Sequence, residues 1–125
     1  MAVSVDTSVR PSWVRTGYKF FPYAAQQADQ WWVLRFNVGF PEHDMYTIFV
    51  DNQVVGDVTG DPDSSVPLIA SIGALNPSRP QEPMLDPAGA RAVVEGVARF
   101  VDYGSERGDS CVFCSDNRDA LTPEA

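Results

Sequence analysis

The sequence predicts an α+β fold: a mainly antiparallel β-meander sheet of about four to six strands, with one main C-terminal helix packed on one face. Residues 31–59 contain three consecutive segments rich in aromatic and β-branched residues. Two of these segments are separated only by Asp51-Asn52, a pair that tolerates the positive φ angles of a tight hairpin turn. Residues 87–103 then carry apolar residues at helical spacing. Strands followed by a helix are typical of a two-layer α+β fold.

The chain has 125 residues, of which 44% are apolar, and this length fits one domain with its own core. We expect a flexible N-terminal arm over residues 1–12 and a single α+β domain over residues 13–114. The remaining residues, 115–125, read as a polar C-terminal tail.

The first strand is expected over residues 13–21, with Val14, Tyr18 and Phe20 on one face and Pro22 at its end. Residues 23–30 are polar and alanine-rich, which indicates a connection with room for one helical turn. Three strands follow, over residues 31–38, 45–50 and 53–59.

The second half of the chain begins with a loop over residues 60–65. Residues 66–75 fit either a short helix or a buried strand, because the period of a short apolar run does not separate the two. Four prolines make residues 76–87 an irregular connection, and residues 110–114 are suited to a last short strand.

The main helix is expected from Pro87 to about Tyr103, with Asp86 as its N-cap and Gly104 as its stop. Its side chains form one apolar stripe that we expect to pack against the sheet: Ala90, Val93, Val94, Val97, Phe100 and Val101.

Both faces of the predicted sheet are apolar, whereas one helix covers only one of them. A two-residue turn places Met45, Thr47, Phe49, Val54 and Val58 on one face, and Tyr46, Ile48, Val50 and Val55 on the other. The second face must be covered by residues 66–75, by the N-terminal arm, or by another molecule. We therefore expect a residual apolar patch that binds a protein partner or a second copy. The candidate interface residues are Trp31, Trp32, Met45 and Phe49.

The net charge is −8, from 9 basic and 17 acidic residues. This charge argues against nucleic acid as a partner. No segment has the length or the flanks of a membrane span or a signal peptide, so we expect a cytoplasmic protein without a membrane partner. The acidity either keeps the chain soluble or complements a basic partner.

The two cysteines form a C-x-x-C motif, Cys111 to Cys114, which is the candidate metal site. This spacing allows both sulfurs to reach one zinc ion or to cycle between dithiol and disulfide. Zinc usually takes four ligands, and the chain has no second C-x-x-C motif and only one histidine, His43. Two ordinary thiols without a cofactor are the preferred interpretation.

Three further patterns have both a chemical and a structural interpretation, and the structural one is preferred for each. Glu42-His43-Asp44 resembles part of a general-base or metal site, but a polar hairpin loop explains it. Asp57, Asp61 and Asp63 suggest calcium, but they also suit a turn. Pro77, Pro80 and Pro83 resemble a P-x-x-P ligand or a stiff connector.

Three function classes remain open from these residues. The leading hypothesis is a small, acidic, non-catalytic protein-interaction domain of the inhibitor or immunity type, because no recognisable nucleophile or catalytic constellation is present. The first alternative is a C-x-x-C protein that binds zinc or carries out thiol redox chemistry. The second is a small-ligand-binding domain whose pocket, between sheet and helix, is lined by Trp32, Tyr46 and Phe100.

Overall fold

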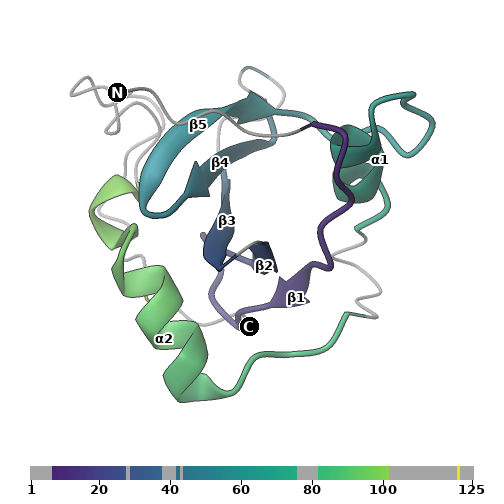
Figure 1. The fold of residues 1–125 in the computed structure, drawn as a ribbon. Helices are drawn as coiled ribbons and strands as arrows, with labels where there is room; N and C mark the ends of the chain where they lie inside the picture. The colour runs from purple at the N-terminus through teal and green to yellow at the C-terminus, as the bar shows by residue number, and fades with distance from the viewer. Residues whose placement is uncertain are drawn as a thin grey trace.

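The meander predicted from the sequence is present in the computed structural model, which describes residues 7–27, 29–37, 42, 44–75, 82–101 and 121. Five antiparallel strands lie in the sheet in chain order (Figure 1). They are β1 (Val14–Arg15), β2 (Tyr23–Gln27), β3 (Gln30–Phe36), β4 (Tyr46–Val50) and β5 (Gln53–Val58). The chain continues into α1 (Pro67–Gly73), α2 (Pro87–Glu95) and the short 3₁₀ helix η1 (Ala98–Phe100).

The first two strands differ from the sequence prediction. The first strand, expected over residues 13–21, is limited to two residues, and the expected connection over residues 23–30 contains β2. Ala24 and Ala25 pair with Val33 and Trp32 of β3, so their small side chains fit beside large neighbours in the sheet. Alanine has a low strand propensity, which explains why this strand was missed.

The hairpin between β4 and β5 has the predicted two-residue turn. Asp51 and Asn52 both adopt positive φ angles, 53° and 64°, as a turn matched to the twist of the strands requires. The pairing then shifts by one residue, since Phe49 faces Val54 whereas Ile48 faces Gly56. Val55 is therefore the extra residue of a β-bulge.

This bulge corrects the predicted assignment of residues to the two faces. Val58 pairs with Tyr46 rather than lying on the face of Phe49. Asp57 in turn lies opposite Thr47, on the face where an apolar residue was expected. The alternation of side chains holds only up to the bulge, and beyond it every residue of β5 changes face.

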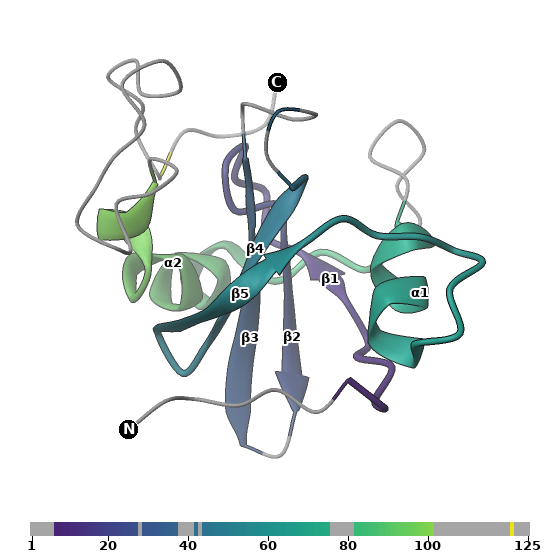
Figure 2. The same cartoon turned by 90° about the horizontal axis from the view of Figure 1, so that it is seen from above.

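The two helices lie on opposite faces of the sheet (Figures 1 and 2). The segment 66–75, for which the sequence allowed either a helix or a strand, contains the helix α1. In α2, Pro87 occupies the first turn and the carboxylate of Asp86 accepts a hydrogen bond from the Gly89 amide, 3.0 Å away, so the predicted start is confirmed. The five-stranded antiparallel sheet with two helices fits the predicted α+β class.

The predicted end of the main helix near Tyr103 is wrong. The helix ends at Glu95 with Gly96 as its C-cap, and the chain continues into η1. A side chain at Gly96 would collide with the Asn52 side chain, so the hairpin turn packs directly on this end of the helix. Glycine is a weak helix former, and any larger residue at this position would require the Asn52 side chain to move.

Each face of the sheet carries its own hydrophobic cluster. On the α1 face, Leu68 and Ile72 of the helix pack on the even-numbered residues of β3 and β4, together with Trp13. On the α2 face, Val93, Val94 and Val97 pack on Val33 and Phe49. The uncovered apolar face expected from the sequence is absent among the described residues, because the chain covers both faces itself.

The edge of the sheet at β1 is extended by residues 82–85. The Arg15 amide donates to the Pro83 carbonyl at 2.8 Å, and the Leu85 amide donates to the Arg15 carbonyl at 2.9 Å, which makes a short parallel bridge. Among the described helices, none has the length and apolar character that crossing a membrane requires.

Candidate functional site

The strongest charge feature is a cluster of carboxylates at one end of the β4–β5 hairpin. The sequence holds no lysine or arginine between Phe36 and Ser78, although it holds six acidic residues there. Five of them flank the start of β4 or the end of β5, and we call these five the acidic edge: Glu42, Asp44, Asp57, Asp61 and Asp63. All except the partly buried Asp57 are exposed.

The acidic edge is held by hydrogen bonds between neighbouring segments. The Thr59 hydroxyl donates to Asp44 Oδ1 at 2.7 Å and accepts from the Met45 amide at 3.1 Å. In the loop after β5, Asp61 Oδ1 accepts from the Asp63 amide at 2.9 Å, as in an Asx turn. The carboxylates of Asp44 and Asp61 are therefore held in place by hydrogen bonds.

The loop from β5 to α1 is also fixed by close backbone packing. The Asp61 amide donates to the Ile69 carbonyl of α1 at 3.2 Å. A side chain at Gly73 would collide with the backbone of Asp61 and Pro62, and one at Gly60 would collide with that of Gly73. Figure 2 shows this loop projecting from the molecule beside α1. Its exposed carboxylates are thus presented on a rigid support.

A buried polar network lies beside the acidic edge, on the α2 face. Arg35 is 0% exposed. Its Nε donates to Asn37 Oδ1 at 2.9 Å and its Nη2 to the Thr47 hydroxyl at 2.8 Å. Its Nη1 donates to the carbonyl oxygen of Phe100, 2.7 Å away, which ties η1 to the sheet. Buried charges require such partners, so the network fixes the positions of β3, β4 and η1.

Asp57 connects the buried network to the acidic edge. The Thr47 hydroxyl donates to Asp57 Oδ1 at 2.7 Å, and Asn37 Nδ2 donates to the Asp44 carbonyl at 2.9 Å. The bulge at Val55 is what brings Asp57 opposite Thr47. Bulges occur often where a side chain must be redirected near a functional site.

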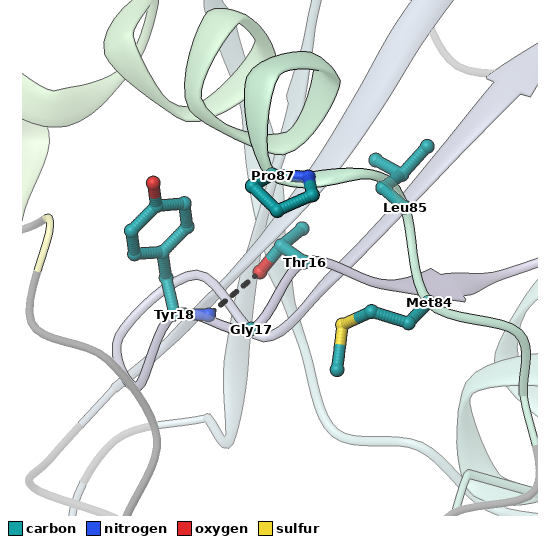
Figure 3. Close-up of a pocket in the computed structure, with 6 residues that line it drawn as sticks. All are labelled: Thr16, Gly17, Tyr18, Met84, Leu85 and Pro87. Carbon is teal, nitrogen blue, oxygen red and sulfur yellow. Dashed lines mark hydrogen bonds between the residues drawn. The ribbon is translucent and has the colours of Figure 1, made fainter.

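A separate apolar pocket of about 350 Å³ lies at the β1 edge of the sheet. Figure 3 shows Tyr18 on one side and Met84 on the other, with Gly17 between them and Pro87 above. Thr16 and Leu85 complete the lining. The Thr16 hydroxyl is engaged within the chain, since it donates to the Phe21 carbonyl and accepts from the Tyr18 amide. The pocket therefore offers mainly apolar contacts.

The four predicted interface residues are not equally accessible. Trp32 and Phe49, 5% and 0% exposed, belong to the core clusters on opposite faces. Trp31 and Met45 are partly buried at the margins of those clusters. Contact of Trp32 or Phe49 with another molecule would require a helix to move, whereas contact of Trp31 and Met45 stays a prediction.

The pocket predicted between sheet and helix is not formed by the three residues named for it. Trp32 and Tyr46 lie in the cluster under α1, but Phe100 packs in the other cluster, where it stacks on Phe49 with ring centroids 5.4 Å apart. The two sets of residues are separated by the sheet. The pocket in Figure 3 shares none of them.

The remaining candidates concern metals and peptide motifs. In the part of the chain that the structure describes, no group of three or more His, Cys, Asp or Glu side chains could hold a metal ion. Asp57, Asp61 and Asp63 thus make no calcium site there, and the preferred interpretation of Asp61 as a turn residue is confirmed. Cys111, Cys114, His43 and the prolines at 77 and 80 lie outside the described residues.

Sequence reasoning missed two of these features. The acidic edge is not apparent from the net charge, but the absence of lysine and arginine over residues 36–78 is a signal for it in the sequence. Arg35 stood on an alternating strand between apolar residues, which already indicated a charge inside the sheet. No family model, curated protein or solved structure matches this chain.

Proposed function

We propose that this chain is a small, non-catalytic protein-interaction domain whose acidic edge binds a basic surface on a partner protein. The single observation that carries the proposal is the set of exposed carboxylates that flank the start of β4 and the end of β5, within a 43-residue stretch that has no lysine or arginine to neutralise them. Complementary charge raises association rates and selects partners.

Rigidity supports this interpretation over solubility alone. A surface that serves only solubility needs charge but no fixed geometry, whereas binding costs less when the contacting groups are already ordered. Asp61 and Asp63 are ordered by the Asx turn and by the packing of Gly60 against Gly73. A single-domain protein that blocks a basic cleft, as inhibitors and immunity-type proteins do, would use such a loop.

The test compares two variants that remove the same charge from different places. Asp61→Asn/Asp63→Asn keeps the turn, because an asparagine oxygen still accepts the amide hydrogen bond. Asp29→Asn/Asp51→Asn is the matched control, since both positions are exposed, lie away from the edge, and have positive φ angles that asparagine tolerates. Both variants reduce the net charge equally.

Each immobilised protein is used to capture partners from a lysate of the native host, followed by carboxylate-to-amine cross-linking. We expect one basic protein to bind the wild type and the control, and to bind the edge variant roughly 10-fold more weakly, equivalent to about 1.4 kcal/mol. Cross-links should map to Asp61 or Asp63. Equal capture by both variants, or cross-links confined to other residues, would contradict the proposal.

A further inference from the structure

We infer that the partner presents its basic residues on an extended segment, which adds to the outer edge of β5 as a further strand of the sheet. This inference rests on the proposed function, because it names the kind of surface that the acidic edge binds. Its own support comes from the place of β5 in the sheet, the direction of its backbone groups, its side chains and the charge at its end.

The two edges of the sheet, which lie at opposite ends of it in Figure 1, differ in how they are covered. At β1, the Pro83 carbonyl and the Leu85 amide are bonded to Arg15, so that edge already has a neighbour. At the other edge, β4 is the one strand within the described part of the chain that pairs with β5. All five residues of β4 are buried, whereas none of the six residues of β5 is. The outer edge of β5 is therefore accessible.

The backbone of β5 offers hydrogen-bonding groups on this outer edge. Val50 and Gln53 close the two-residue turn, so their peptide groups are bonded to each other across the hairpin. Because the pairs of an antiparallel ladder alternate, the amide and the carbonyl of Val54 point away from β4. Neither group has a hydrogen-bond partner among the residues that the structure describes. Unpaired peptide groups on an outermost strand are a template for another strand.

The residues of β5 favour a single extended segment over a second folded sheet. The strand contains neither proline nor lysine, two residues that commonly protect outer strands. A Cβ atom at Gly56, in the middle of β5, would meet no atom within 4 Å, so the surface is open at this point. The bulge at Val55 increases the local twist, which hinders pairing with another flat edge. A segment that is not already part of a sheet can follow this twist.

The charge at the end of β5 determines which segment fits. Thr59, the residue that follows β5, donates to the exposed carboxylate of Asp44. Asp61 and Asp63 come next in the chain and are also exposed. A basic segment that continues past Val58 would gain attraction to these carboxylates in addition to its backbone hydrogen bonds. A second copy of this chain, with its net charge of −8, would instead meet repulsion.

The experiment titrates the ¹⁵N-labelled full chain with N-acetyl-Arg-Val-Arg-Val-Arg-Val-amide and follows the amide resonances of Val54 and Gly56. The comparison probes are the same peptide with glutamate in place of arginine, and spermidine, which has three positive charges but no peptide groups. We expect saturable shifts with a Kd on the order of 1 mM for the basic peptide, because a short flexible segment loses entropy when it is ordered. Both comparison probes should bind at least about fivefold more weakly. Hydrogen exchange of the Val54 amide should slow at least about fivefold when the basic peptide is bound.

Val54→Pro tests the backbone pairing, because proline lacks the outward N–H group and is tolerated where that group faces solvent on an outermost strand. Val54→Ala is the matched control, since it shortens the side chain but keeps the amide. We expect Val54→Pro to bind the basic peptide roughly 5- to 10-fold more weakly than Val54→Ala, as measured at the Gly56 amide. Asp61→Asn/Asp63→Asn should also weaken binding, whereas Asp29→Asn/Asp51→Asn should not. The exchange rate of Val54 in the wild type gives a second test that needs no substitution.

Strand addition and the acidic edge can fail separately in this experiment. Equal binding by the two Val54 variants, unchanged exchange of the Val54 amide, or equal binding of spermidine would overturn strand addition and leave the acidic edge intact. Undiminished binding by Asp61→Asn/Asp63→Asn would contradict the acidic edge itself, and with it the basic character of the segment. Absence of saturable shifts would overturn the inference, as would dimers of the chain alone, in sedimentation, that Val54→Pro abolishes, because a second copy would then occupy the edge.

Discussion

The two faces of the sheet are closed by different physical means. On the α1 face the buried residues are apolar apart from a short hydrogen-bonded chain, in which Trp13 Nε1 donates to the Ser71 hydroxyl at 3.1 Å and that hydroxyl donates to the Leu68 carbonyl. On the α2 face a buried cation, Arg35, lies beside the apolar cluster and 5.4 Å from the Phe49 ring centroid. The contrast indicates that α1 completes a core, whereas the α2 face also positions groups next to the acidic edge.

The largest expected loss of stability comes from replacing the buried cation, Arg35. Arg35→Met retains much of the volume but removes the Arg35 donor to the Phe100 carbonyl and one of the two donors to Asn37 Oδ1 and to the Thr47 hydroxyl. We expect the free energy of unfolding to fall by roughly 3–5 kcal/mol, as when one partner of a buried charged contact is removed. Chemical denaturation measures the loss.

Arg10→Met is the control for this change, because Arg10 is exposed and should alter stability by no more than about 0.5 kcal/mol. A fully stable Arg35→Met protein would remove the distinction between the two faces, since the α2 face would then behave as an ordinary apolar core.

On the α1 face, substitutions should change the free energy of unfolding through packing alone. Leu68→Ala removes a side chain that is 2% exposed from a helix of seven residues whose N-cap has no side-chain hydrogen bond. We expect a loss of about 2–4 kcal/mol in the free energy of unfolding, because α1 depends on this contact to stay on the sheet. Ala74→Ser, at the exposed end of α1, should change stability by less than about 0.5 kcal/mol. A loss for Leu68→Ala as small as that of the control would mean that α1 does not close this face.

The α1 face should also become sensitive to alkaline pH. Burial, with a smaller effect from Glu82, raises the pKa of Tyr46 to about 12 from 10.0. The folded state then retains a proton that the unfolded state releases, so stability falls as the pH rises from about 10 to 12 and is unaffected by this group below that range. The full fall is roughly 2–3 kcal/mol. This fall should disappear in Tyr46→Phe, and the same variant should lose a late phenolate titration that the folded wild type shows.

An early titration of all tyrosines in the folded protein, or the same alkaline loss in Tyr46→Phe, would show that Tyr46 is not enclosed under α1. Either result would weaken the contrast between the two faces, because the apolar face would then admit water at its centre.

The smallest expected effect is a difference in stability between two substitutions in the same cluster, at Trp13 and at Trp32. Trp13 donates to Ser71, whereas Trp32 Nε1 is buried and has no hydrogen-bond partner among the residues that the structure describes. An unsatisfied donor costs free energy that replacement by phenylalanine recovers. We expect Trp32→Phe to be about 1 kcal/mol less destabilising than Trp13→Phe in denaturant unfolding, as both lose similar apolar area. Equal losses would imply that Trp32 finds a partner in solution.

The sequence predicted those features whose cause is local. The Asp51-Asn52 turn and the Asp86-Pro87 helix start are determined by residues adjacent in the chain, and both are confirmed. β2 was missed because Ala24 and Ala25 are strand residues only through their contacts with Val33 and Trp32. Likewise, the helix stops where Asn52, more than 40 residues earlier, meets Gly96.

The candidate surfaces were predicted less well, because they too depend on contacts between residues that are distant in the chain. A bulge moves Asp57 to the α2 face, and strict alternation cannot indicate a bulge from β5 alone. The pocket beside β1 depends on Met84 coming to lie next to Gly17, which no local pattern encodes. The charge gap over residues 36–78 was visible in the sequence, but only the hydrogen bonds of Asp61 show that its carboxylates are held in place.

The bridge at the β1 edge has a consequence for how the chain reaches its native state. The hairpins of the meander join neighbours in the chain, so their loops close at low entropic cost. Arg15 Nε, by contrast, donates to the carbonyl of Glu82, 67 residues away, and this closure is expected to come late. Until then β1 presents an open edge that could pair with another chain. Rapid refolding from denaturant at high concentration should therefore give more aggregation than refolding at low concentration, and Arg15→Ala, which removes that bond, should widen the difference.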